Sequence, residues 1–134
     1  MESAGTQTYE AANASAPFGT NGWRAYMGSA GADSTQGLAA VVCATEPAGW
    51  AQVSSPYVSN PAGKATTATV TCPSGTKVLG GGPFNSSADP SVTIGLTTSV
   101  SSLKGWHSSE HNNSSVSESV DEWAVCAQVV SAAS

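Results

Sequence analysis

The sequence has few charged residues, and basic ones are especially scarce. Only 10% of its 134 residues are charged, with four Lys and Arg against nine Asp and Glu, for a net charge of −5. An ordinary soluble domain has about 25% charged residues. Nucleic-acid binding relies on clustered basic side chains that neutralise phosphates. Here the four basic residues are scattered through the chain, so we expect no nucleic-acid partner; they are Arg24, Lys64, Lys77 and Lys104.

Long hydrophobic runs are absent as well. The longest apolar stretch, Leu38 to Ala44, is far shorter than the roughly 20 residues that span a bilayer, so we expect no membrane insertion. The first residues, Met1 to Gly5, contain no apolar core of the kind found in export signals, and we expect no signal peptide in this chain. A hydrophobic content of 40% is too high for a disordered chain. The length therefore predicts a single folded domain over residues 1–134.

Two stretches of the sequence match at a constant spacing. Gly22-Trp23 is followed, 20 residues after the Trp, by Cys43-Ala44, and Gly105-Trp106 is followed at the same interval by Cys126-Ala127. Such self-similarity predicts an internal repeat. Only the second copy carries the segment around Cys72, so we expect half a repeat over about residues 6–46 and a complete repeat over about 47–131.

The three cysteines are interpreted through this repeat. Cys72 and Cys126 lie at the two ends of the complete repeat, and we predict that they form a disulfide. Cys43 occupies the place of Cys126 in the half repeat, which predicts an unpaired or intermolecular thiol. The other pairing, Cys43 with Cys72, closes a shorter loop and stays open at this point.

The pattern of side chains indicates strands throughout. Thr66–Cys72 and Ser91–Val100 alternate in a way typical of half-buried strands. Trp123–Val130 and Leu38–Ala44 are apolar on both faces and predict central strands covered on both sides. With 22 serines and 13 threonines and no stripe of helical period, the sequence predicts an all-β module built as an antiparallel sandwich, barrel or prism.

A longer pattern carries a resemblance to a known kind of module. Its parts are Gly49-Trp50, Thr69 to Pro73, Gly75, Val78 to Gly82, and then Gly105-Trp106 with Trp123 and Cys126-Ala127. This pattern resembles a repeat module of uncharacterised secreted actinobacterial proteins, and also C-terminal modules of collagen-like surface and phage proteins. The resemblance implies an exported β module and no particular reaction.

Motifs with catalytic meaning are weak. His107 to His111 spells H-x-x-E-H, but a zinc site of that kind needs both histidines on one helical face. On a strand they would lie about 13 Å apart, so we expect no metal, no cofactor and no catalytic residue. Asp121 and Glu122 are adjacent and should point to opposite faces. Gly80, Gly81 and Gly82 lack the Lys of a phosphate loop and predict a bulge or a close backbone crossing.

The four tryptophans divide into two groups. Trp23 and Trp106 recur at one position of the repeat, and together with Trp123 they are expected to be structural anchors, as are the three glycines. Trp50 follows a turn-forming Ala-Gly pair, and we single it out as a candidate for stacking on a glycan.

These observations predict a non-enzymatic, extracellular structural or adhesive module of a cell surface, a secreted assembly or a virion. Because a half repeat leaves an edge strand without a partner, we expect self-association. The alternative is a carbohydrate-binding module, with a cell-surface glycan or protein as partner; a small secreted hydrolase ranks below both.

Overall fold

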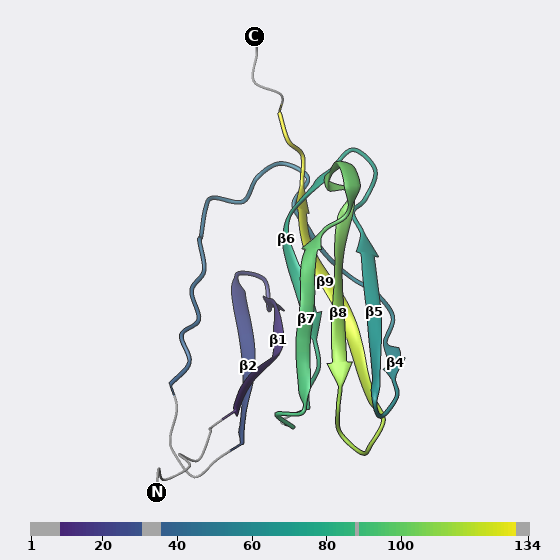
Figure 1. Cartoon of the computed structure of the whole chain (residues 1–134). Helices are drawn as coiled ribbons and strands as arrows, with labels where there is room; N and C mark the ends of the chain where they lie inside the picture. Colours follow the sequence, from purple (N-terminus) through teal and green to yellow (C-terminus); the bar gives the residue numbers. More distant parts are fainter. Residues whose placement is uncertain (1–8, 31–35, 88, 131–134) are drawn as a thin grey trace, which may run out of the picture.

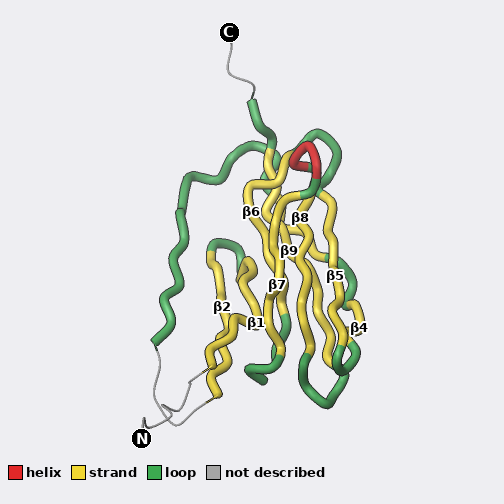
Figure 2. The backbone as a smooth tube through the Cα atoms, in the orientation of Figure 1, coloured by secondary structure: helices red, strands yellow, loops and turns green. Residues whose placement is uncertain are grey.

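The structure is a computed structural model that describes residues 9–30, 36–87 and 89–130. It is all-β, as predicted, and several antiparallel sheets pack against one another (Figures 1 and 2). The strands are β1 Tyr9–Phe18, β2 Gly22–Ala30, β3 Ala51–Ser54, β4 Val58–Asn60, β5 Lys64–Thr71, β6 Lys77–Phe84, β7 Val92–Ser99, β8 Gly105–Asn112 and β9 Glu118–Ala127, with a single 3₁₀ turn, η1 Ser101–Leu103, between β7 and β8.

Two sheets form a sandwich from β3 to β9. In one sheet β9 is central: β6 pairs along one of its edges, and the short strands β3 and β4 share the other. In the second sheet β8 is central, between β5 and β7. Trp123–Val130 was expected to be a central strand, and β9 takes that place, although it begins earlier and ends at Ala127.

The interior of the sandwich is apolar at one end and polar at the other. The apolar end is a cluster of Val70, Cys72, Val78, Ala124 and Cys126, with Val53 and Trp106 packed against it. The polar end holds fully or almost fully buried amides and carboxylates, which are Asn60, Asn85, Glu110, Asn112 and Glu122. Small side chains and buried polar groups thus replace the large aliphatic residues of an ordinary core.

One strand departs from the expected alternation. The alternation of Ser91–Val100 predicts Val92, Ile94, Leu96 and Val100 on one face of a strand, yet Val92 is buried and Leu96 is 55% exposed. The register of β7 against β8 shifts between Ile94 and Leu96. Gly95 is the extra residue of a β-bulge, and one extra residue turns every later side chain to the opposite face.

The first two strands form a hairpin with the same irregularity as β7 and β8. In β1 the bulge residue is Asn13, opposite the Tyr26–Met27 step of β2. In β7 it is Gly95, opposite the Ser109–Glu110 step of β8. The two steps are 83 residues apart, which is the offset between the two Gly-Trp pairs. The hairpins β1–β2 and β7–β8 therefore correspond in register as well as in sequence.

The tryptophans of the two hairpins also make matching hydrogen bonds. The indole of Trp23 donates to the hydroxyl of Ser15 at 3.0 Å, and the indole of Trp106 donates to the hydroxyl of Thr97 at 2.7 Å. Each acceptor lies two residues after the bulge residue of its hairpin. The division of the chain into a half and a complete repeat remains a prediction, to which these matches lend geometric support.

The hairpin β1–β2 packs beside the sandwich, along β6 and the start of β7 (Figure 1). The guanidinium of Arg24 lies 3.7 Å from the centre of the Phe84 ring, a cation–π contact. The side-chain amide of Asn13 donates to the carbonyls of Asp89 and Val92, at 2.8 and 2.6 Å. The backbone carbonyl of Ser15 occupies the space where a β-carbon at Gly82 would stand.

The prediction of a central strand at Leu38–Ala44 was wrong. Residues 36–46 belong to no strand and have no backbone hydrogen bond within the described ranges. Leu38 is 93% exposed and Val42 is 97% exposed. The segment is apolar, but a strand also needs a neighbour to pair with, and within the described ranges this segment pairs with none. We call residues 36–47 the strap.

Candidate functional site

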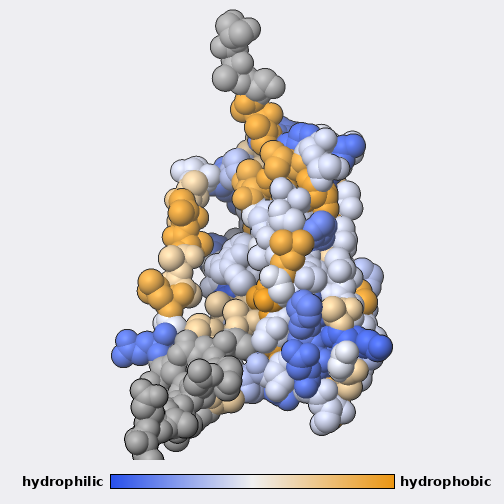
Figure 3. Space-filling view, viewed as in Figure 1, coloured by the Kyte–Doolittle hydropathy of each residue, from blue (hydrophilic) through white to orange (hydrophobic). Residues whose placement is uncertain are grey.

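A cavity of about 560 Å³ lies between the strap and the outer face of the sheet that contains β3, β6 and β9. The strap forms one wall, with residues from Ala40 to Pro47. In Figure 3 the strap stands away from the body of the molecule, with open gaps beside it. The opposite wall consists of Trp23 at the start of β2, of Trp50 directly before β3, and of residues from the three sheet strands, among them Gln52, Leu79 and Val125.

The structure brings two of the four tryptophans into this cavity. Trp50, the candidate for glycan stacking, is half-buried there, and Trp23 lines the same space. The indole N–H of Trp23 donates to the hydroxyl of Ser15, so it is mainly the apolar ring of Trp23 that is available for contacts in the cavity. Trp106 packs against the apolar core, and Trp123 donates to Asp121 at 2.7 Å. Sequence reasoning singled out Trp50 but did not foresee Trp23 as its companion.

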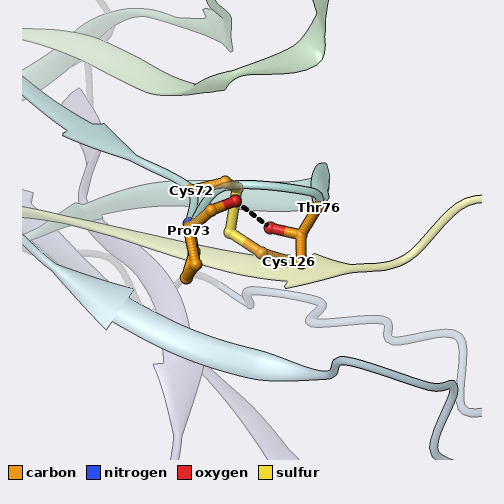
Figure 4. The surroundings of a disulfide bond; sticks show 4 residues. All are labelled: Cys72, Pro73, Thr76 and Cys126. Atoms are coloured by element: carbon orange, nitrogen blue, oxygen red, sulfur yellow. Dashed lines mark hydrogen bonds between the residues drawn. A yellow bond between two sulfur atoms is a disulfide. The ribbon is translucent and has the colours of Figure 1, made fainter.

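Cys43 is part of the cavity wall and carries a free, exposed thiol. Cys72 and Cys126 form the disulfide that the sequence predicts, and the alternative pairing of Cys43 with Cys72 was wrong. The bond links the end of β5 to β9 and so joins the two sheets at the apolar end of the interior (Figure 4). Next to it the hydroxyl of Thr76 donates to the carbonyl of Pro73 at 2.7 Å, which closes the turn before β6.

The three consecutive glycines play different parts. A β-carbon at Gly81 would lie 2.5 Å from both the Trp106 ring and the carbonyl of Trp123. One at Gly82 would collide with the carbonyl of Ser15, whereas one at Gly80 would meet nothing within 4 Å. Gly81 and Gly82 thus permit close packing on the two faces of β6, and Gly80 follows the bulge of that strand.

Glu110 is held at the polar end of the interior by two amides. The side chains of Asn60 and Asn85 donate to its Oε1 atom at 2.9 and 2.8 Å. Its other oxygen accepts no hydrogen bond from any residue that the structure describes. Burial raises the pKa of Glu110 above its ordinary value, although the two amides act against this. The H-x-x-E-H pattern that contains Glu110 did not indicate that this residue is buried.

Glu122 has fewer hydrogen-bond partners than Glu110. It has no exposed surface, and neither of its carboxylate oxygens accepts a hydrogen bond in the part of the chain described. The nearby hydroxyl of Ser108 donates to Thr97 instead. Burial, with a smaller contribution from the neighbouring Asp121, raises the pKa of Glu122 to about 8, and the nearby Ser108 opposes this rise only in part. Glu122 is therefore largely protonated at neutral pH, and a neutral acid is far less costly to bury than a carboxylate.

Asp121 and Glu122 point to opposite faces of β9, as expected, yet both are buried. Asp121 faces the hairpin β1–β2, and burial raises its pKa while the Trp123 indole and Arg24 act to lower it. A signal for the buried acids was present in the sequence. Trp106, Ser108, Glu110 and Asn112 occupy alternate positions of one strand, which places the polar three on the same face as the partly buried Trp106.

The histidines of the H-x-x-E-H motif lie on the other face of β8, where His107 is half-buried and His111 exposed. Among the residues that the structure describes, no three His, Cys, Asp or Glu side chains gather in a way that could hold a metal ion. The described ranges also contain no helix long and apolar enough to cross a membrane.

Comparison of the chain with protein-family models, with curated proteins and with solved structures gave no match in any of the three. The cavity, the strap and the buried acids are therefore interpreted from their own geometry.

Proposed function

We propose that this chain is a non-enzymatic structural or adhesive β module that works outside the cell and associates with other copies of itself. The observation that carries the proposal is the strap. An extended apolar segment with unpaired backbone groups is a template for pairing with another chain. Between Gln36 and Thr45 the strap contains neither a charge nor a proline that would discourage such pairing.

An extracellular place is supported by the disulfide and by the surface. Disulfides persist in oxidising compartments such as the cell exterior, and Cys72–Cys126 joins the two sheets of the sandwich. The resemblance to secreted and phage surface modules points the same way. A chain of this kind suits a cell surface, a secreted assembly or a virion.

Light scattering after size-exclusion chromatography tests the proposal. We expect the chain to elute with a mass above the 13.3 kDa of one copy and to shift further as its concentration rises. A constant single-chain mass up to the highest attainable concentration refutes self-association and with it the proposed role.

A second candidate, a carbohydrate-binding module, is favoured by one observation. Trp23 and Trp50 line the same cavity as the polar side chains of Asn21, Glu46 and Gln52. Sugar rings stack on aromatic faces while polar groups bind their hydroxyls. Titration with soluble cell-wall glycan fragments should then quench tryptophan emission, and Trp50→Ala should abolish the effect. Tyr57→Ala is the matched control, because Tyr57 is an exposed aromatic residue outside the cavity.

A further inference from the structure

The hairpin β1–β2 lacks a neighbour that its counterpart has. In the sandwich, the edge of β8 that faces away from β7 is occupied by β5, with Val70 opposite Trp106 and Thr71 opposite Gly105. The corresponding edge of β2, beside Gly22 and Trp23, has no paired strand within the described ranges. The two hairpins share their bulge and their indole–hydroxyl bond, so the missing neighbour is a strand of the β5 kind.

The cavity lies at the place where this strand would run. Gly22 and Trp23 line it, and these are the counterparts of the residues that pair with the end of β5. The strap runs past the same edge of β2. It approaches β2 closely where Gly37 meets the side chain of Met27, and it is separated from Trp23 by the cavity. The result is a slot with the edge of β2 on one side and the strap on the other.

Both sides of the slot are suited to an added strand. Neighbouring strands lie about 4.8 Å apart and are joined by backbone groups, and the strap has such groups unpaired. Beyond Arg24, which is engaged with the Phe84 ring, the rest of β2 carries no charge. Natural sheets protect their edges with charges or prolines, and neither protects this one.

We propose that the slot between β2 and the strap binds a β-strand of a second copy of this chain, which pairs antiparallel with β2. The chain itself contains a suitable strand. β5 alternates Thr with Ala and Val and already packs beside the tryptophan of the complete hairpin. It is also an edge strand of its own sheet, so one of its edges is free to pair. Strand addition to an open sheet edge is a common mode of protein association. This inference rests on the proposed self-association and names the surface that carries it.

Paired lysine substitutions test the surface. Val42→Lys places a charge in the wall of the slot at a fully exposed residue, so the folded monomer should tolerate it. A lysine at this position is desolvated when a strand enters, and we expect the dissociation constant for self-association to rise about tenfold or more. Val116→Lys is the control, because Val116 is also exposed but lies outside the cavity; its self-association should equal that of the wild type.

A peptide with the sequence of residues 64–71 provides an independent measurement. We expect it to compete with self-association and to change the tryptophan emission of the full-length chain, whereas the same peptide with Thr67→Pro should do neither, because proline cannot donate to a ladder. If the wild type associates but Val42→Lys behaves like Val116→Lys, the slot is wrong and the proposed function stands. If the chain stays monomeric, both are refuted. Trp50-dependent glycan binding by a monomeric chain would show that the cavity serves a glycan and not a second copy.

Discussion

The buried carboxyl of Glu122 should make the stability of this protein fall as pH rises through neutrality. The unfolded chain loses the Glu122 proton near its ordinary pKa of 4.5, whereas the folded chain keeps it up to about pH 8. Between these values unfolding releases a proton, so a higher pH favours the unfolded state. Below the lower value both states are protonated, and the group has no effect on the free energy of unfolding.

The size of the effect follows from the two pKa values. Each pH unit in this window lowers the free energy of unfolding by about 1.4 kcal/mol. From pH 4.5 to 8 the loss amounts to about 5 kcal/mol, which is a large part of the 5–15 kcal/mol or so that stabilises a typical domain. The pKa values of the buried Glu110 and Asp121 are also raised, so these two residues also lower the free energy of unfolding as the pH rises.

Glu122→Gln isolates the contribution of this one residue. The substitution keeps the shape of the side chain and removes its titration. Urea unfolding at several pH values between 4 and 8.5 gives the free energy of unfolding as a function of pH. Its decrease with rising pH should be steeper in the wild type than in the variant, by about 1.4 kcal/mol per pH unit. Glu46→Gln, at an exposed position, serves as the control and should retain the wild-type slope. Equal slopes in the wild type and Glu122→Gln would refute the assignment of a buried, protonated acid.

Three further changes test the packing. Gly82→Ala forces a β-carbon into the backbone carbonyl of Ser15 in β1 and should lower the free energy of unfolding by about 1–3 kcal/mol. A β-carbon at Gly80 meets open space, so Gly80→Ala should change the free energy of unfolding by less than about 1 kcal/mol. Chemical denaturation of the two variants tests both values. Replacing Cys72 and Cys126 together by alanine removes a crosslink across 54 residues, which should cost about 4 kcal/mol, and an unchanged melting temperature would contradict this. Leu103 has a φ of 55°, a conformation that costs a non-glycine residue about 1 kcal/mol, so Leu103→Gly should raise the melting temperature by a few degrees.

The sequence predicted the parts of this fold that depend on local alternation and on the repeat. Thr66–Cys72 lies on a strand or directly after it because its hydroxyl and small apolar residues alternate. The Cys72–Cys126 bond was predicted from the places of the two cysteines in the expected complete repeat, and it is present. The bulge at Gly95 could not be foreseen from hydrophobicity, since one extra residue reverses the faces of β7 without changing the pattern before it.

The remaining differences have a common cause, which is that burial depends on neighbours rather than on the residue alone. Glu110 and Glu122 are polar by sequence and buried by position, since each lies on the inner face of a central strand. Leu38 and Val42 are apolar by sequence and exposed, because no strand in the described part of the chain pairs with the strap. Trp23 and Trp50 lie at separate places in the sequence, and the packing of the hairpin β1–β2 beside the sandwich brings them to one cavity.

The extra residue in the first strand of each hairpin shows how one structural plan can serve two purposes. A bulge residue stands outside the ladder, so its side chain can vary while the hairpin keeps its form. At position 95 a β-carbon would press on His111, and glycine is found there. At position 13 the side-chain amide of asparagine donates hydrogen bonds to the carbonyls of Asp89 and Val92, which hold the hairpin against the start of β7. The form of the hairpin and its place of attachment are thus encoded by separate residues, and a duplicated hairpin could gain a new docking point through a single substitution.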